Sequence, residues 1–225
     1  MRFQTLLAFV GLGSLPLSQA ISGKSYTGWD CCKPGCAWKE NLAWSYGVQG
    51  SPKVCNAGNN PVWDGLNTQS GCQTGNGFLC DLYAPTPVTE QLSYGFATMN
   101  GAHNCCKCFQ LTWRNGAAAG KQMIVQAING FDVTGDLKAS DMVILSPGGG
   151  HGPNEAGCKK QYGRTWGASN GGVSNRFECD QLPANLQGGC YWRYNWARGG
   201  INTWDIDYNQ VACPSRLTSI SGCSA

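Results

Sequence analysis

The chain has 225 residues, a formal net charge of +3 and only 13% charged residues. This length suits a single domain, and the weak, scattered positive charge does not indicate a protein that binds nucleic acid or an anionic membrane surface. Glycine and tryptophan are frequent, with 32 and 9 residues, which is typical of a loop-rich protein that leaves some aromatic rings at its surface.

The first 20 residues have the features of a secretory signal peptide. Arg2 precedes an apolar run over residues 5–13, and the Ser-Gln-Ala sequence at residues 18–20 offers the small residues that signal peptidase requires. We expect cleavage after Ala20 and secretion of residues 21–225 as a soluble protein. No later stretch approaches the roughly 20 apolar residues that a membrane-spanning helix needs.

The cysteines predict a covalently stapled fold. All 14 follow residue 20, and an even number in an exported chain predicts seven disulfides and no metal site or other cofactor. Cys31 and Cys32 are adjacent and cannot pair with each other without severe strain, so each must tie this segment to a different part of the chain. Asp30 would then be held rigidly, either as a pre-organised acid or base or as a surface carboxylate in a disulfide knot.

In chain order, residues 45–80 are rich in Gly, Asn, Ser and Pro and are expected to form irregular loops. Leu92, Phe96 and Met99 lie at helical spacing after a possible cap at Thr89 and predict a helix over residues 89–99. Strands are predicted over residues 109–113, 121–128, 141–145, 191–196 and 205–212, a mobile glycine loop over 148–150, and a short helix over 174–180. Several short strands with few helices and many cross-links predict a small β-barrel.

Carboxylates are the best candidates for catalysis. His103 and His151 have no recognisable nucleophile partner, no Gly-x-Ser-x-Gly motif is present, and every cysteine has a potential disulfide partner. Hydrolysis of a glycosidic bond needs one acid at the leaving oxygen and one carboxylate that activates water or attacks the sugar, and exposed tryptophan rings suit sugar binding. The carboxylates near predicted strands or glycine loops are Asp30, Asp132, Asp136, Asp141 and Glu155.

Residues 29–36, Trp-Asp-Cys-Cys-Lys-Pro-Gly-Cys, resemble the signature of glycoside hydrolase family 45, secreted endoglucanases that cut internal β-1,4 bonds of cellulose with inversion. Further segments that look like those of the family follow in family order, at residues 94–97, 105–108, 135–137, 147–150, 172–176, 178–180 and 189–194. The resemblance implies a mainly β fold, a six-stranded double-psi β-barrel with long disulfide-stapled loops and a few short helices. It implies one catalytic domain over residues 21–225, with no linker or carbohydrate-binding module.

The resemblance also assigns residues to roles. Asp30 falls on the general base, Trp29 on the aromatic beside it, Trp38 on a groove tryptophan and Asp136 on an accessory carboxylate. The implied partner is a β-glucan polysaccharide such as cellulose, bound by a monomer without a metal or organic cofactor. The implied disulfides are Cys31–Cys158, Cys32–Cys72, Cys36–Cys105, Cys55–Cys80, Cys106–Cys223, Cys108–Cys213 and Cys179–Cys190.

Two positions depart from the family pattern. The general acid falls on Val143, and a sugar-contacting tyrosine is replaced by Gly28. Asp141 lies two residues before Val143, on the same face of a strand but displaced by about 7 Å at about 3.3 Å per residue. Three hypotheses stay open: a hydrolase with Asp141 as its acid, an expansin-like protein that binds and loosens β-glucan without hydrolysis, and a secreted effector or inhibitor on the same scaffold.

Overall fold

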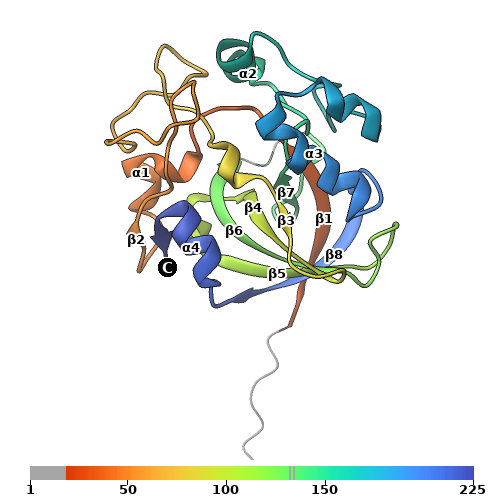
Figure 1. Cartoon of the computed structure of the whole chain (residues 1–225). Coiled ribbons are helices and arrows are strands. Elements are labelled where there is room, and N and C mark those ends of the chain that lie inside the picture. Colours follow the sequence, from red (N-terminus) through yellow and green to blue (C-terminus); the bar gives the residue numbers. More distant parts are fainter. Residues whose placement is uncertain (1–18, 132, 134) are drawn as a thin grey trace, which may run out of the picture.

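Six strands close into a barrel in the computed structural model, which describes residues 19–131, 133 and 135–225 (Figure 1). The sheet order is β3-β4-β6-β5-β8-β1-β7, and pairing of β4 with β7 closes the ring. The barrel strands are β1 (Ile21–Gly28), β4 (Leu92–Asn100), β5 (Cys108–Trp113), β6 (Gln122–Phe131), β7 (Met142–Leu145) and β8 (Trp204–Val211). The expected six-stranded barrel is therefore confirmed, whereas the leader expected over residues 1–20 falls almost wholly outside the described residues.

Short elements and long loops surround the barrel. The α-helices are α1 (Lys39–Leu42), α2 (Glu155–Tyr162), α3 (Ala184–Asn195) and α4 (Ser215–Ser221), and the 3-10 helices are η1 (Gly35–Ala37), η2 (Asp81–Tyr83), η3 (Ala102–Asn104) and η4 (Arg176–Gln181). Two-residue strands are β2 (Gln49–Gly50), β3 (Thr86–Pro87) and β9 (Cys223–Ser224). In the described part of the chain, no helix has both the length and the apolar character needed to cross a membrane.

Four predicted strands are confirmed as β5, β6, β7 and β8, but the helix predicted over residues 89–99 is wrong. That segment forms β4, which is buried on both faces from Gly95 to Met99. Phe96 packs in one core cluster and Met99 in the other. A strand covered on both sides carries apolar residues without the alternation of a half-buried strand, so its spacing coincided with that of a helix.

The strand predicted over residues 191–196 is also wrong, because most of this segment belongs to α3. Leu186, Gly189, Cys190 and Arg193 are buried at positions i, i+3, i+4 and i+7, which is the core-facing stripe of a helix. Its aromatic residues favoured a strand by composition alone. The helix predicted over residues 174–180 is the 3-10 helix η4, and its N-cap is Asn175.

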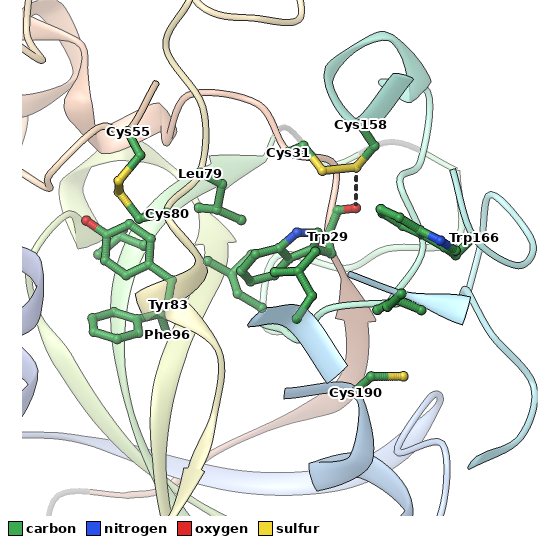
Figure 2. Packing of buried hydrophobic residues seen from close by; sticks show 14 of the residues in the cluster. Trp29, Cys31, Cys55, Leu79, Cys80, Tyr83, Phe96, Cys158, Trp166 and Cys190 are labelled. Atoms are coloured by element: carbon green, nitrogen blue, oxygen red, sulfur yellow. Dashed lines mark hydrogen bonds between the residues drawn. A yellow bond between two sulfur atoms is a disulfide. The ribbon is translucent and has the colours of Figure 1, made fainter. Parts of the chain in front are cut away.

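The structure forms seven disulfides, and they are the pairs that the resemblance implied. Among the described residues no cysteine is free. The Cys31–Cys158 bridge lies beside the buried ring of Trp29 in a cluster with Leu79 and Phe96 (Figure 2). The loops are thus fastened to the barrel covalently as well as by apolar packing.

The glycines at 148–150 do not form a free loop but pack tightly against the end of β1. The amide of Trp29 donates a hydrogen bond to the carbonyl of Gly150 at 2.9 Å. A Cβ atom on Gly149 would lie 2.8 Å from the backbone nitrogen of Gly28, closer than real Cβ contacts occur. Glycine is needed here for close approach of two backbones, and this approach places the segment after residue 150 next to Asp30.

Candidate active site

An open cleft with a volume of about 550 Å³ lies where β1 and β7 end. Its lining includes Asp30 after β1, Val143 and Leu145 of β7, and the loop of residues 150–154. The opposite wall includes Trp38 and the segment of residues 70–73. Among the described residues that line the cleft, Asp30 is the only carboxylate.

Asp30 is half-buried and fixed by two hydrogen bonds. The amide of Cys32 donates to its Oδ1 at 2.9 Å, and Nδ2 of Asn154 donates to its Oδ2 at 3.3 Å. Burial raises the pKa of Asp30, and these two hydrogen bonds oppose part of that increase because they favour the ionised form. The result is a carboxylate with a fixed orientation and more basicity than an exposed aspartate has.

Covalent bonds on both sides of its backbone hold Asp30 in place. Cys31 adopts a left-handed conformation with φ of 59°, a costly backbone state for a residue other than glycine. Its disulfide to Cys158 fixes that turn, and the disulfide from Cys32 to Cys72 ties the next residue to the opposite wall. The sequence prediction that Asp30 is rigidly held agrees with this geometry.

Trp29 and Trp38 occupy different environments. Trp29 contributes to the cleft lining, but only 2% of it is exposed and its ring belongs to the core cluster beneath Asp30. Trp38 is half-buried at the cleft, where the ammonium of Lys33 lies 3.7 Å from its ring centroid. Lys33 also donates to the carbonyls of Leu66 and Thr68, each at 2.9 Å, so it fixes the ring and the neighbouring loop together.

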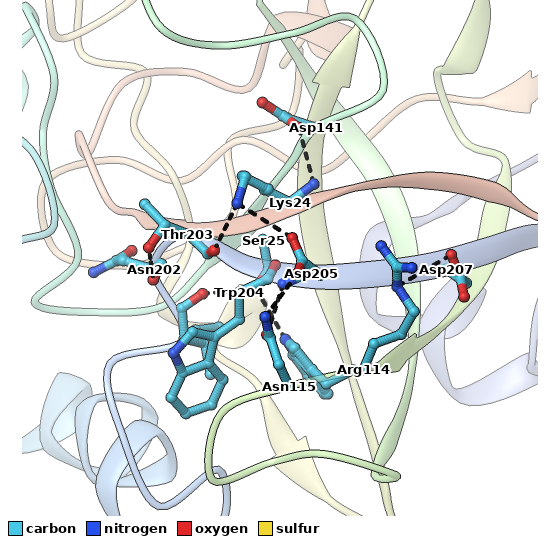
Figure 3. A network of polar contacts seen from close by, with 12 residues as sticks. Lys24, Ser25, Arg114, Asn115, Asp141, Asn202, Thr203, Trp204, Asp205 and Asp207 are labelled. Atoms are coloured by element: carbon cyan, nitrogen blue, oxygen red, sulfur yellow. Dashed lines mark hydrogen bonds and ion pairs between the residues drawn. The ribbon is translucent and has the colours of Figure 1, made fainter.

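The structure does not bring Asp141 to Asp30. Asp141 is 1% exposed, and the amide of Lys24 donates a hydrogen bond to its Oδ1 at 2.9 Å (Figure 3). The amide of Lys138 donates to its Oδ2, also at 2.9 Å. Lys24 lies six residues before Asp30 on the extended β1 segment, which corresponds to about 20 Å at about 3.3 Å per residue. That separation far exceeds the roughly 6.5–9.5 Å between the carboxyls of an inverting pair. Asp141 therefore fastens the start of β7 to β1.

The two departures from the family pattern lie side by side in the cleft. Val143 is half-buried and lines the cleft where the resemblance places the general acid. A Cβ atom on Gly28 would lie 2.7 Å from Cγ1 of Val143. The branched valine thus fills space that a side chain at position 28 would need.

The other candidates contribute less, or were not foreseen from the sequence. Asp136 is exposed and precedes Leu137, which lines the cleft, whereas Glu155 is exposed and pairs with Lys159 on α2 at 2.8 Å. Asp132 lies outside the described residues.

Two further residues at the cleft were not predicted from the sequence as site residues. His151 lines the cleft, and Asn154 binds Asp30. The only feature of the sequence that pointed to Asn154 was its position shortly before a predicted disulfide cysteine. In the described ranges no cluster of three His, Cys, Asp or Glu side chains is arranged to hold a metal ion.

Comparisons with known proteins agree with this geometry. The sequence model of glycosyl hydrolase family 45 matches residues 22–224. A putative endoglucanase type K from Fusarium oxysporum is 39% identical over 99% of this chain, and an endoglucanase from Cryptopygus antarcticus is 38% identical over 90% of it. The chain spans 58% of the length of the Fusarium relative and 88% of the Cryptopygus relative.

A solved structure shares the fold over nearly its whole length. The crystal structure of a cellulase from the Antarctic springtail Cryptopygus antarcticus superposes with a TM-score of 0.81 at 34% sequence identity. The match covers 92% of this chain and 98% of that cellulase. The barrel and the loops around the cleft therefore belong to an architecture that is already known from experiment.

We expect substitution of Asp141 by alanine to destabilise the fold by about 3 kcal/mol, because two backbone amides lose a charged acceptor in a buried setting. Urea denaturation at pH 7 measures this loss. The matched control is Asp207→Ala, which removes a partly exposed carboxylate that lies 3.4 Å from Arg114 and accepts a hydrogen bond from Ser22 at 2.6 Å, and it should cost at most about 1 kcal/mol. Equal stability of the two variants would contradict the structural role of Asp141.

Proposed function

Because the chain belongs to glycosyl hydrolase family 45, we propose that it is a secreted endo-β-1,4-glucanase that hydrolyses internal bonds of cellulose or a related β-glucan. The observation that carries the proposal is Asp30, a half-buried carboxylate held by adjacent disulfides in an open cleft beside Trp38. An open cleft admits a polymer at any point along its length. The endoglucanases named among the relatives support the same substrate class.

In this proposal Asp30 is the general base. Its carboxylate accepts a proton from a water molecule as the water oxygen attacks the anomeric carbon, and the glycosidic bond breaks with inversion. Burial raises the pKa of Asp30, which strengthens its ionised form as a base. The hydrogen bonds from Cys32 and Asn154 orient the carboxylate toward the cleft without any movement of the backbone.

Protonation of the leaving oxygen is the slow step of the proposed reaction. Valine at position 143 cannot donate a proton, and Asp141 is engaged at the other end of β7. Without a positioned acid, water must protonate the leaving group, and the loss of general acid catalysis costs about 10²–10⁴-fold in rate. Asp136 stays an accessory carboxylate in this proposal, exposed and next to Leu137, which lines the cleft.

Val143 also favours a second candidate function, in which the protein binds and loosens β-glucan without cutting it. Stacking of sugar rings on Trp38 requires no acid, and Asp30 would then bind sugar hydroxyls as an acceptor. Trp29 supports the cleft floor from below in both proposals, since its ring is buried. The two functions differ in one measurable quantity, the production of new chain ends.

The proposed location is extracellular, and the proposed active form is a monomer. Seven disulfides form and persist only where the environment is oxidising, which supports secretion. The cleft is lined from within one chain, so a single copy contains every group that the proposed reaction uses.

Replacement of Asp30 by asparagine should reduce hydrolysis by at least about 10²-fold, because the base is lost while the side-chain shape is kept. New reducing ends and viscosity loss on carboxymethylcellulose measure this effect. Asp180→Asn, which changes an exposed carboxylate away from the cleft lining, should retain full activity. Wild-type activity no greater than that of Asp30→Asn, together with measurable glucan binding, would reject hydrolysis in favour of the second candidate.

Substitution of Val143 by aspartate should raise the hydrolysis rate by about 10²–10⁴-fold, because it places an acid on the cleft wall facing Asp30. Aspartate also lacks the branched methyl that crowds Gly28. Val133→Asp adds the same charge at an exposed position and should leave the rate unchanged. An unchanged rate in Val143→Asp, with wild-type activity intact, would mean that another group already donates the proton.

Asn154→Ala should move the acidic limb of the kcat/KM profile to higher pH. The amide of Asn154 stabilises ionised Asp30, so its loss raises the pKa of Asp30 further, and the ionised base then disappears at a higher pH as the solution is acidified. Asn185→Ala, which removes an equivalent hydrogen bond to Asp81, is the matched control. Coincident acidic limbs for wild type and Asn154→Ala would show that Asp30 does not set this limb.

A further inference from the structure

Three large aromatic side chains stand uncovered in one part of the fold. Trp44 is 76% exposed, and Tyr46 and Trp63 are essentially fully exposed, at 97% and 103%. All three lie in the loops between α1 and η2, drawn in orange to yellow beside α1 in Figure 1. Single exposed apolar residues are ordinary, but three large rings in one loop region of a soluble protein suggest a binding surface.

Trp63 is displayed on a rigid turn. Directly after it, the carbonyl of Asp64 accepts hydrogen bonds from the amide and hydroxyl of Thr68 at 3.0 and 2.6 Å. The carboxylate of Asp64 accepts two more from the amide and side chain of Asn67 at 3.2 and 2.8 Å. Before it, the amide of Val62 donates to the carbonyl of Val54 at 2.8 Å. Because the backbone that carries Trp63 is fixed in this way, it loses little freedom when the ring binds a ligand.

Trp44 and Tyr46 flank a buried anchor. Ser45 lies between them, and its hydroxyl makes contacts of 3.1 and 2.8 Å with the carbonyl oxygens of His103 and Cys105. Cys105 is in turn bridged to Cys36. The backbone between the two exposed rings is therefore tied to the barrel, so their exposure does not come from a loose loop.

The exposed rings are connected to the cleft through Lys33. Its ammonium contacts the ring of Trp38 and the carbonyls of Leu66 and Thr68, which belong to the same turn as Trp63. Trp38 lines the cleft and immediately precedes α1, and Trp44 follows that helix. The exposed rings thus continue from the Trp38 end of the cleft over one connected loop region.

We propose that Trp44, Tyr46 and Trp63, here termed the aromatic platform, bind the sugar faces of insoluble β-glucan outside the cleft. Flat aromatic rings suit the apolar faces of sugar rings and need no charge on the ligand, which fits an uncharged polysaccharide. The platform attaches the domain to a solid substrate without a separate binding module. The choice of polymer rests on the proposed function, whereas the exposure and anchoring of the rings do not.

A second copy of this chain is a poorer occupant of the platform. Each aromatic side chain buries about 150–250 Å², so three rings provide less than the roughly 800 Å² per partner of a stable protein interface. A glucan chain needs only stacking on successive rings. The area and the continuity with the cleft both favour the polysaccharide.

The test measures binding isotherms on microcrystalline cellulose with the full chain carrying Asp30→Asn, so that hydrolysis does not alter the solid. Trp63→Ala and Trp44→Ala should each weaken binding about tenfold, as expected for loss of an aromatic anchor. Trp63→Phe should retain most of the binding, since it keeps a planar ring. Phe177→Ala is the matched control, because Phe177 is also 76% exposed but lies on η4.

Two readouts separate this proposal from the proposed hydrolysis. With Asp30 present, the platform variants should hydrolyse soluble cellohexaose at the wild-type rate, because the platform lies outside the cleft. If no glucan is cut but the platform variants still bind cellulose more weakly than Phe177→Ala, hydrolysis fails and the platform stands. The proposal is overturned if the platform variants bind cellulose as Phe177→Ala does. It is also overturned if they change only the oligomeric state of the protein in solution, since a second copy would then be the occupant.

Discussion

The pair of disulfides formed by the adjacent residues Cys31 and Cys32 is the constraint on which the rest of the site depends. Cys31 is bonded to Cys158 and Cys32 to Cys72. These two disulfides hold the backbone of Cys31 in its unfavourable left-handed conformation. Asp30 directly precedes these two cysteines, and the amide of Cys32 donates to its carboxylate, so the orientation of that carboxylate is fixed. A carboxylate that is pre-positioned in this way needs no reorganisation when a substrate enters, which is the general requirement for an efficient base.

Tight backbone packing extends this constraint to the other wall of the cleft. Glycines 148–150 pack closely against the end of β1, and this packing places Asn154 within hydrogen-bond distance of the Asp30 carboxylate. Val143 and Gly28 occupy adjoining space on the same side. A side chain at position 28 would therefore clash with Val143, because this wall of the cleft is close-packed.

Most of the buried tryptophans have a hydrogen-bond partner for the indole N–H, but Trp29 does not. Trp113, Trp192 and Trp196 pack together, and each indole N–H donates a hydrogen bond to a serine hydroxyl or a backbone carbonyl. Trp38 is instead fixed by a cation, and Trp44 and Trp63 stand in solvent. The ring of Trp29 is buried although its N–H has no partner, so apolar packing in the cluster beneath Asp30 keeps it inside.

The sequence predicted a small β-barrel with seven disulfides and a rigidly held Asp30, and its resemblance to a known family implied the disulfide pairs, because cysteine number and local motifs depend little on distant context. Two elements were predicted wrongly from the sequence. The strand β4 is buried on both faces, so its apolar residues fell at helical spacing, and the aromatic residues of α3 favoured a strand. Only the tertiary structure decided that Asp141 lies at the remote end of β7 and that Asn154 reaches Asp30. Residues two apart in a strand share a face in any sequence. The distance between residues on different strands is instead set by the stagger of the strands when the barrel closes.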